Sequence, residues 1–271
     1  MTDPSPPGSK LDTTVAHPAR RYNYWLGGKD HFAADRESGD QVAAAFPTVR
    51  IAARANRDFL RRTVEFLAGE AGIRQFLDVG TGLPTADNVH ELAQRIAPGS
   101  RVVYVDNDPL VMSHARALLT STPEGRTVYL ERDVRDPDSI LDAPELRHTL
   151  DLGQPVGLTL AAVVHFVRDF EDPYGVVRRF VDALPPGSYL VLSHGTYDGL
   201  PAGVVERLEQ ANAASGGLSR TRSRAEVDRF FDGLELVEPG VVPLAQWRPA
   251  PGAEIPDPVD ICMYGGVARI P

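Results

Sequence analysis

The sequence predicts an α/β fold: a doubly wound sheet of seven mostly parallel strands, with an N-terminal helical extension. Segments of strand length alternate with helix-like segments from residue 73 onward. Residues 156–164 form an almost unbroken apolar run, which is typical of a central parallel strand buried on both faces. An apolar strand at 75–79 leads directly into Gly80 and Gly82, and a helical pattern follows. Such a turn at the first strand of a doubly wound sheet favours close approach of a nucleotide-like ligand.

The composition limits the class of protein. The chain has 271 residues, of which 42% are hydrophobic and 24% charged, as in ordinary globular domains. A net charge of −9 argues against nucleic acid or anionic membranes as partners. Cys262 is the single cysteine, which excludes an internal disulfide and a CxxC metal site, so we expect no metal. We find neither a membrane-spanning run nor a signal peptide, and we expect a cytoplasmic protein.

The N-terminal part divides in two before the sheet begins. Residues 1–18 are rich in Pro, Ser and Thr and are predicted to form a disordered tail. Residues 19–72 are predicted to form a helical extension or lid, and 73–271 the ligand-binding domain. Within the extension, 19–45 is dense in aromatics and charge and breaks at Gly27-Gly28. Residues 50–68 predict one long amphipathic helix with an arginine stripe on its polar face.

The remaining elements follow in alternation. The predicted strands are 75–79, 101–105, 127–131, 156–164, 188–193, 234–237 and 261–267. The predicted helices are 86–96, 109–119, 172–184, 204–214 and 224–231. The proline-rich stretch 239–258 is expected to be an irregular surface loop.

Three acidic residues stand at or near the carboxyl ends of the first three strands. Asp78 precedes the glycine turn, Asp106 ends the second strand before Asn107, and Asp133 follows the third. An acidic residue at the end of the second strand accepts hydrogen bonds from ribose hydroxyls in such folds. Each of these positions taken alone is equally typical of a helix cap. Three in series predict an adenosine-bearing cofactor.

The glycine-containing loop after the first strand also indicates which cofactor is bound. A nicotinamide dinucleotide favours Gly-x-Gly-x-x-Gly, and Thr85 stands where the third glycine would be. Asp78 suits a cofactor with a free amino group better than a pyrophosphate. No Gly-Lys-Ser/Thr sequence is present, so a P-loop is excluded.

With these motifs, residues 75–193 resemble the class I S-adenosylmethionine-dependent methyltransferases. More narrowly, the chain resembles an actinobacterial methyltransferase family of unassigned substrate. The segments that carry this narrower resemblance are 22–35, 56–60, 75–85 and 187–194. It covers nearly the whole chain and implies S-adenosylmethionine as the cofactor in a Rossmann-like fold.

The resemblance also implies roles for residues of this sequence. Asp78, Gly80, Thr81 and Gly82 would border the methionine end of the cofactor. The other cofactor-binding residues that it implies are Asp106 and Asn107 at the ribose, Asp133 and Val134 at the adenine, and Ala161 and Ala162 beside the sulfonium. A final antiparallel strand is expected from 261–267. The chain departs from many relatives at Pro155-Val156-Gly157, where no catalytic carboxylate is evident.

The sequence offers weaker candidates for the acceptor side. His165 and His194, just past the fourth and fifth predicted strands, are candidate general bases. Either could instead bond nearby backbone or cap a helix. The lid and acceptor-contacting residues are predicted to be Tyr22, Asn23, Tyr24, Lys29 and Phe32. A helix pair packing its aromatics on the domain is the alternative.

The predicted function is S-adenosylmethionine-dependent methyl transfer to a small-molecule acceptor in secondary metabolism. Two alternatives stay open at this point. One is an NAD-dependent oxidoreductase, and the other is an S-adenosylmethionine-binding regulator without catalysis. The sequence predicts no oligomeric state and does not say which atom is methylated.

Overall fold

A single mixed sheet organises the molecule. The computed structural model describes residues 11–118 and 120–271. In this part of the chain the strand order is β3-β2-β1-β4-β5-β8-β6, and β7 pairs separately with β8. The first five strands are parallel, whereas β6, β7 and β8 are joined by antiparallel pairing. The strands are β1 (Gln75–Val79), β2 (Arg101–Asp106), β3 (Arg126–Glu131), β4 (Gly157–Ala161), β5 (Tyr189–Gly195), β6 (Glu235–Leu236), β7 (Val242–Pro243) and β8 (Met263–Arg269).

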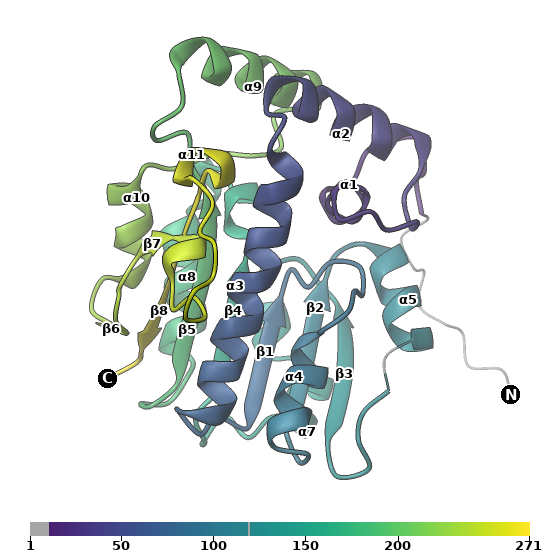
Figure 1. The fold of residues 1–271 in the computed structure, drawn as a ribbon. Helices are drawn as coiled ribbons and strands as arrows, with labels where there is room; N and C mark the ends of the chain where they lie inside the picture. The colour runs from purple at the N-terminus through teal and green to yellow at the C-terminus, as the bar shows by residue number, and fades with distance from the viewer. Residues whose placement is uncertain (1–10, 119) are drawn as a thin grey trace, which may run out of the picture.

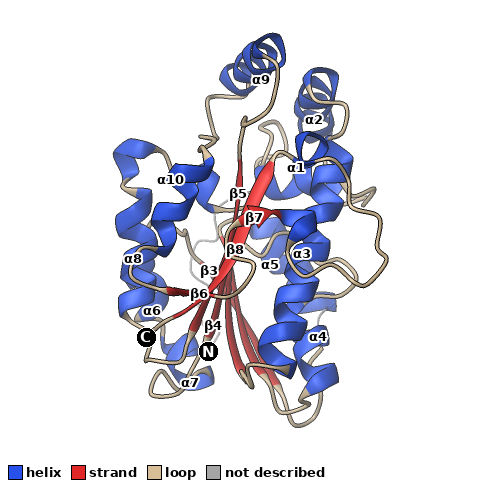
Figure 2. Cartoon of the chain, turned by 60° about the vertical axis from the view of Figure 1, so that its left-hand side comes forward, coloured by secondary structure: helices blue, strands red, loops and turns tan. Residues whose placement is uncertain are grey.

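Helices cover both faces of the sheet, as Figure 2 shows with the sheet seen nearly edge-on. One layer consists of α3 (Val49–Gly69), α4 (Val89–Ile96) and α5 (Pro109–Leu118). The opposite layer consists of α6 (Pro137–Leu141), α7 (Pro144–Thr149), α8 (Pro173–Asp182) and α10 (Arg224–Asp228). Beyond the strand ends, at the top of Figure 1, lie α1 (Pro18–Trp25), α2 (Ala33–Ala45) and α9 (Ala202–Ala214).

Short elements complete the chain. They are α11 (Pro258–Ile261) and the 3-10 turns η1 (Val164–Phe166), η2 (Asp169–Glu171), η3 (Arg229–Phe231) and η4 (Leu244–Gln246). No helix of the described residues is long and apolar enough to cross a membrane.

Local sequence signals explain where several helices begin. Asp172 accepts a hydrogen bond from the Gly175 N–H, and Pro173 occupies the first turn of α8, where its missing donor costs nothing. Asn88 and Glu91 form a capping box at α4, which therefore starts three residues after the predicted position 86. Both signals can be read in the sequence.

The predicted α/β fold with a doubly wound sheet is confirmed. Two strands end at positions that differ from the predicted ones. The fourth strand stops at Ala161, because Ala162 takes a φ of 54° and its N–H turns to Ser193. The fifth strand runs on to Gly195, because β8 pairs with it up to Met263. His194 therefore lies inside β5, and its predicted place just past the strand is wrong.

The C-terminal strand is antiparallel, as predicted, but it spans Met263–Arg269 rather than 261–267. Ile261 ends α11, and Cys262 follows with a φ of 49° that breaks the helix. The stretch predicted as an irregular loop contains β7 and η4. Those two elements become regular only because β8 and α3 supply their partners.

The N-terminal extension separates into two environments. α3 buries Phe59, Val64 and Leu67 in the same core cluster as strand residues Phe76 and Val191, so it forms part of a helical layer. α1 and α2 instead lie beyond the carboxyl ends of the strands (Figure 1). Of the predicted tail, residues 1–10 lie outside the described residues, and residues 11–17 lead into α1.

Candidate functional site

The predicted site lies at the carboxyl edge of the parallel strands. The strand order places β1 at the centre, between β2 and β4, where the winding of the sheet reverses direction. The next strand after β1 lies on one side of it, and the strand after β3 lies on the other. In open α/β sheets, ligands bind at this topological switch point.

The two glycines of the turn after β1 have different tasks. Gly80 has a φ of 78°, and a Cβ there would lie 2.4 Å from Cγ2 of Val163. Its lack of a side chain therefore lets the loop pack against the chain after β4. Gly82 has a φ of 69°, and a Cβ there would meet no atom within 4 Å. Gly82 is thus the point where a ligand can approach the loop backbone.

Asp106 ties the end of β2 to this loop. Its Oδ2 accepts a hydrogen bond from the Gly82 N–H at 2.8 Å, and its Oδ1 accepts one from the Asp108 N–H at 3.0 Å. Burial raises the pKa of this carboxyl, and these two backbone donors oppose the shift. A carboxylate offers about four lone-pair positions, so two acceptor positions stay available for two hydroxyl donors.

Asp133 is linked to Asp106 through the neighbouring residue. Asn107 donates a hydrogen bond from Nδ2 to Oδ2 of Asp133 at 2.9 Å, and Arg135 binds both carboxylate oxygens. Burial acts to raise the pKa of Asp133, but Arg135 and Asn107 outweigh it and lower the pKa to about 2. The adjacent Val134 N–H has no acceptor among the described residues. The backbone N–H of Arg135 also donates to Asp133, so four donors occupy the carboxylate and the Val134 N–H is the group left to meet an adenine ring nitrogen.

Asp78 is buried, at 4% exposure, in the interior of β1. Thr159 on the neighbouring β4 donates its hydroxyl to Oδ1 of Asp78 at 2.5 Å. Burial raises the pKa of Asp78, whereas the hydroxyls of Thr159 and Thr81 and the charge of Arg57 oppose that shift. Asp78 therefore braces the loop that begins at Gly80 and links it to β4.

A hydrogen-bonded chain joins the end of β4 to the helices. The Ala162 N–H, beside Ala161, donates to Oγ of Ser193 at 2.9 Å, and Ser193 donates to Oδ1 of Asn56 at 2.6 Å. Asn56 in turn donates to the hydroxyl of Tyr22 at 3.0 Å. The two alanines predicted to border the sulfonium are thus held by β5, α3 and α1 together.

A buried ion pair holds α1 against the end of β2. Arg20 donates from Nε to Oδ2 of Asp108 at 2.9 Å, and Nδ1 of His17 lies 3.1 Å from the same oxygen. Asp35 on α2 accepts hydrogen bonds from the N–H groups of His17 and Phe32. Sequence reasoning did not single out His17, Arg20, Asp35 or Asp108. Arg20 and Asp35 are charged residues of the segment 19–45, which the lid hypothesis represented by other residues, whereas Asp108 stands two residues after Asp106.

The predicted lid residues do not share one environment. Tyr22 donates to the backbone oxygen of Ala53 at 2.8 Å and packs inward, whereas Tyr24 donates outward to Asp40 on α2 at 2.7 Å. Asn23 is buried and accepts the Asp30 N–H, so it braces the turn at Gly27-Gly28.

The last two lid candidates lie apart. Lys29 is exposed. Phe32 lies under the Arg20 guanidinium, 5.5 Å from its ring centre. The structure thus brings Tyr22 and Phe32 to the buried side of the extension and leaves Tyr24 and Lys29 away from it.

His194 is fully buried, and both ring nitrogens are engaged. Nδ1 lies 2.8 Å from the oxygen of Gly195, and Nε2 lies 2.9 Å from NH1 of Arg222. Because an arginine can only donate, Nε2 accepts and the proton is on Nδ1. Burial, the neighbouring His165 and the charge of Arg222 lower the pKa of His194 well below its usual value. This geometry leaves His194 no free lone pair for a substrate.

His165 is the histidine that retains a free nitrogen. It lies in η1, directly after the turn at Ala162, and its ring meets that of His194 edge-on at 5.6 Å. Its Nδ1 is buried without a hydrogen-bond partner among the described residues. Burial, together with the charges of Arg21 and Arg222, lowers the pKa of His165 to about 3. His165 is therefore a neutral imidazole near pH 7.

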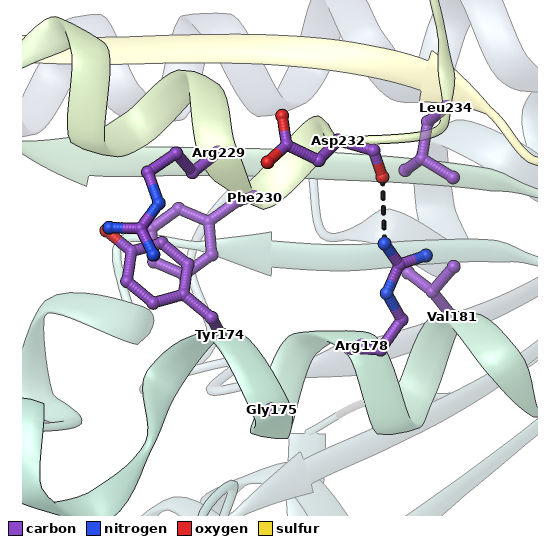
Figure 3. Close-up of a pocket in the computed structure, with 8 residues that line it drawn as sticks. All are labelled: Tyr174, Gly175, Arg178, Val181, Arg229, Phe230, Asp232 and Leu234. Atoms are coloured by element: carbon purple, nitrogen blue, oxygen red, sulfur yellow. Dashed lines mark hydrogen bonds between the residues drawn. The ribbon is translucent and has the colours of Figure 1, made fainter.

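Two cavities lie away from the predicted site. One of about 310 Å³ opens between α8 and η3, on a face of the sheet rather than at its carboxyl edge. In Figure 3, Arg229 lies over Tyr174, and Arg178 donates to the backbone oxygen of Asp232. A second, of about 430 Å³, is lined by residues such as Arg101 and His148. Neither cavity is lined by any of the predicted site residues. At the predicted site, α1 lies against the carboxyl edge of the sheet.

The comparisons with known proteins show which family and which folds the chain resembles. The profile of a family described as S-adenosyl methyltransferase matches residues 4–271. A crystal structure of a DUF574 family protein from Streptomyces avermitilis is 54% identical, with a TM-score of 0.93, over 97% of this chain and 100% of that one. A candidate methyltransferase from Thermobifida fusca is 41% identical, with a TM-score of 0.87, over 97% and 98% of the two chains. No curated protein matches this chain.

Proposed function

The chain belongs to the S-adenosyl methyltransferase family, and on that premise we propose that it methylates a small-molecule acceptor of secondary metabolism in the cytoplasm. Family and fold make it an S-adenosylmethionine-dependent methyltransferase. The alternative of an NAD-dependent oxidoreductase is thereby set aside, in line with Thr85 at the third glycine position.

One observation carries the assignment of the cofactor site to this edge. Gly82 faces open space while its N–H orients Asp106, and Asp106 keeps acceptor positions for a diol. The residues present therefore fit an adenosine-bearing group. Asp106 and Asn107 would hold the ribose, and the Val134 N–H would hold the adenine while Asp133 fixes its loop through Arg135. Asp78 with Gly80, Thr81 and Gly82 would hold the methionine end.

S-adenosylmethionine supplies an already activated methyl group, so the protein mainly aligns the acceptor and excludes water. Ala161 and Ala162 would leave room beside the sulfonium, with their backbone fixed by Ser193 and Asn56. Tyr22 and Phe32 would close the acceptor space from the lid.

His165 is the proposed proton acceptor for an acceptor that carries O–H or N–H. Such a nucleophile loses its proton when it gains a methyl group. Nδ1 of His165 can take that proton once a bound acceptor offsets the burial and positive charges that hold the pKa of the free imidazole at about 3. His194 is not proposed again as a base, because Arg222 and Gly195 occupy its ring nitrogens. It supports His165 through their ring contact instead.

Calorimetry with S-adenosylhomocysteine and with NAD tests the cofactor assignment. We expect saturable binding of S-adenosylhomocysteine only. Tight binding of NAD alone would reject the proposal. Transfer of labelled methyl from S-adenosylmethionine to small O–H and N–H acceptors tests the catalytic part. Cofactor binding without transfer to any member of a broad panel would favour a silent regulator.

A further inference from the structure

Two consecutive arginines on α1 have opposite environments. Arg20 and Arg21 are 4% and 8% exposed, so both side chains are largely buried. Arg20 pairs with Asp108 at 2.9 Å and lies 3.8 Å from Asp35. Arg21 has no carboxylate within 4.0 Å among the described residues. A buried cation without a paired anion is costly and is rarely kept for stability alone.

The donors of Arg21 are used unequally. NH1 donates to Oγ of Ser38 at 3.1 Å, and the guanidinium lies 5.3 Å from the Trp25 ring centre. The Nε–H is buried and has no acceptor among the described residues, whereas NH2, which makes no hydrogen bond to them, retains contact with solvent. The Nε and NH2 donors form one edge of the guanidinium. That edge is the one that binds the two oxygens of a carboxylate side by side.

The position of Arg21 connects it with the proposed acceptor space. Tyr22, the next residue of α1, is joined through Asn56 and Ser193 to the Ala162 N–H, so α1 is held at the turn that leads to His165. The charge of Arg21 also contributes to the lowered pKa of His165. His165 also carries an unpartnered buried nitrogen, Nδ1. The turn begins at Ala162, beside the position proposed for the sulfonium. Arg21 with its free Nε–H and His165 with its free Nδ1 thus belong to the two segments, α1 and the turn after β4, that this hydrogen-bonded chain joins.

We propose that Arg21 binds a carboxylate of the acceptor, so that the methylated substrate is a small monocarboxylic acid. This inference rests on the proposed function, because it identifies the space beneath α1 as the acceptor site. One unpaired guanidinium matches one negative charge, which favours a carboxylate over a doubly charged phosphate. With the carboxylate on Arg21, an O–H or N–H elsewhere on the acceptor can reach His165.

The test is carried out on the full chain saturated with S-adenosylhomocysteine, whose binding is measured first. Carboxylates are then titrated against their own amides, with the pairs acetate and acetamide, benzoate and benzamide, and indole-3-acetate and indole-3-acetamide. We expect at least one acid to bind about tenfold or more tighter than its amide, because charge-assisted bonds are lost in the amide. In Arg21→Met this preference should fall below about twofold.

Two controls separate recognition from folding. Arg36→Met removes an exposed arginine of α2 and should leave the preference unchanged. Arg21→Met should melt at or above the wild-type temperature, because it removes an unpaired buried charge while keeping a long side chain. Equal binding of acids and amides, retention of the preference in Arg21→Met, or no binding of any acid at millimolar concentration would overturn the inference. If S-adenosylhomocysteine itself fails to bind, the proposed function fails instead.

Discussion

Nε of Arg20 lies 2.9 Å from Oδ2 of Asp108, although 88 residues separate the two in sequence. Both side chains are almost fully buried. This pair fixes the first helix of the extension to the end of β2, directly beside Asp106. The lid and the proposed ribose site are therefore mechanically linked through Asp108, whose N–H also bonds Asp106.

Breaking this pair should loosen the lid locally. Arg20→Met leaves buried Asp108 with only His17 beside it, and breaking such a pair costs about 3 kcal/mol. Native-state hydrogen exchange of α1 amides measures the loss, because the helix can open without global unfolding. Arg36→Met is the matched control on α2. Unchanged protection of α1 in Arg20→Met would show that the pair does not hold the helix.

Asp106→Asn should weaken binding of S-adenosylhomocysteine by about 1–3 kcal/mol, since it removes charge-assisted bonds to the ribose. Calorimetry measures this change directly. Glu235→Gln, which neutralises an exposed carboxylate paired with Arg269, should leave the affinity unchanged. Wild-type affinity in a folded Asp106→Asn protein would refute the assignment of the ribose to this residue.

The two loop glycines should respond differently to alanine. At Gly80 the added methyl meets Val163 and the backbone strain adds to it, so we expect a loss of about 2–4 kcal/mol in unfolding free energy. At Gly82 the methyl enters open space, so the expected effect is at least about tenfold weaker binding of S-adenosylhomocysteine.

Gly252→Ala is the control for both glycine variants, because this position shares a positive φ and open surroundings away from the site. Urea unfolding and calorimetry on all three variants separate the effects. If the Gly82→Ala protein binds S-adenosylhomocysteine as tightly as the Gly252→Ala protein does, no ligand approaches the loop at Gly82.

His194 should make stability depend on pH. Its folded pKa lies well below the unfolded value of about 6.5, so below that pH the unfolded chain takes up a proton that the folded chain does not. The stabilisation that His194 contributes to the folded state is therefore at its full value above about pH 6.5 and is lost as the pH falls below it. The slope is at most about 1.4 kcal/mol per pH unit.

The comparison of wild type with His194→Asn isolates this contribution from other buried groups such as Asp78, whose pKa is shifted in the opposite direction. Urea unfolding between about pH 4 and 7 should give a shallower pH dependence for the variant. Identical slopes would mean that His194 titrates normally and is not held neutral by Arg222.

Much of the fold was predictable because its signals are local. The alternation of strands and helices, the glycine turn and the acidic strand ends all lie within short windows of sequence. The long helix predicted at 50–68 is α3, Val49–Gly69. The edge strands were harder to predict from the sequence, because β7 has only two residues and its pairing with β8 does not appear in any local pattern.

The site was predictable only as a set of positions. The sequence alone determined that Asp78, Asp106 and Asp133 stand near successive strand ends, because parallel strands bring their carboxyl ends to one edge. The tertiary structure decided what each side chain does there. It bonded His194 to Arg222 and Asp78 to Thr159. It also left the Nε–H of Arg21 without an acceptor among the described residues, within electrostatic reach of His165. These partners come from segments 28 to 144 residues apart, and only the folded chain brings their charges and hydrogen bonds within reach.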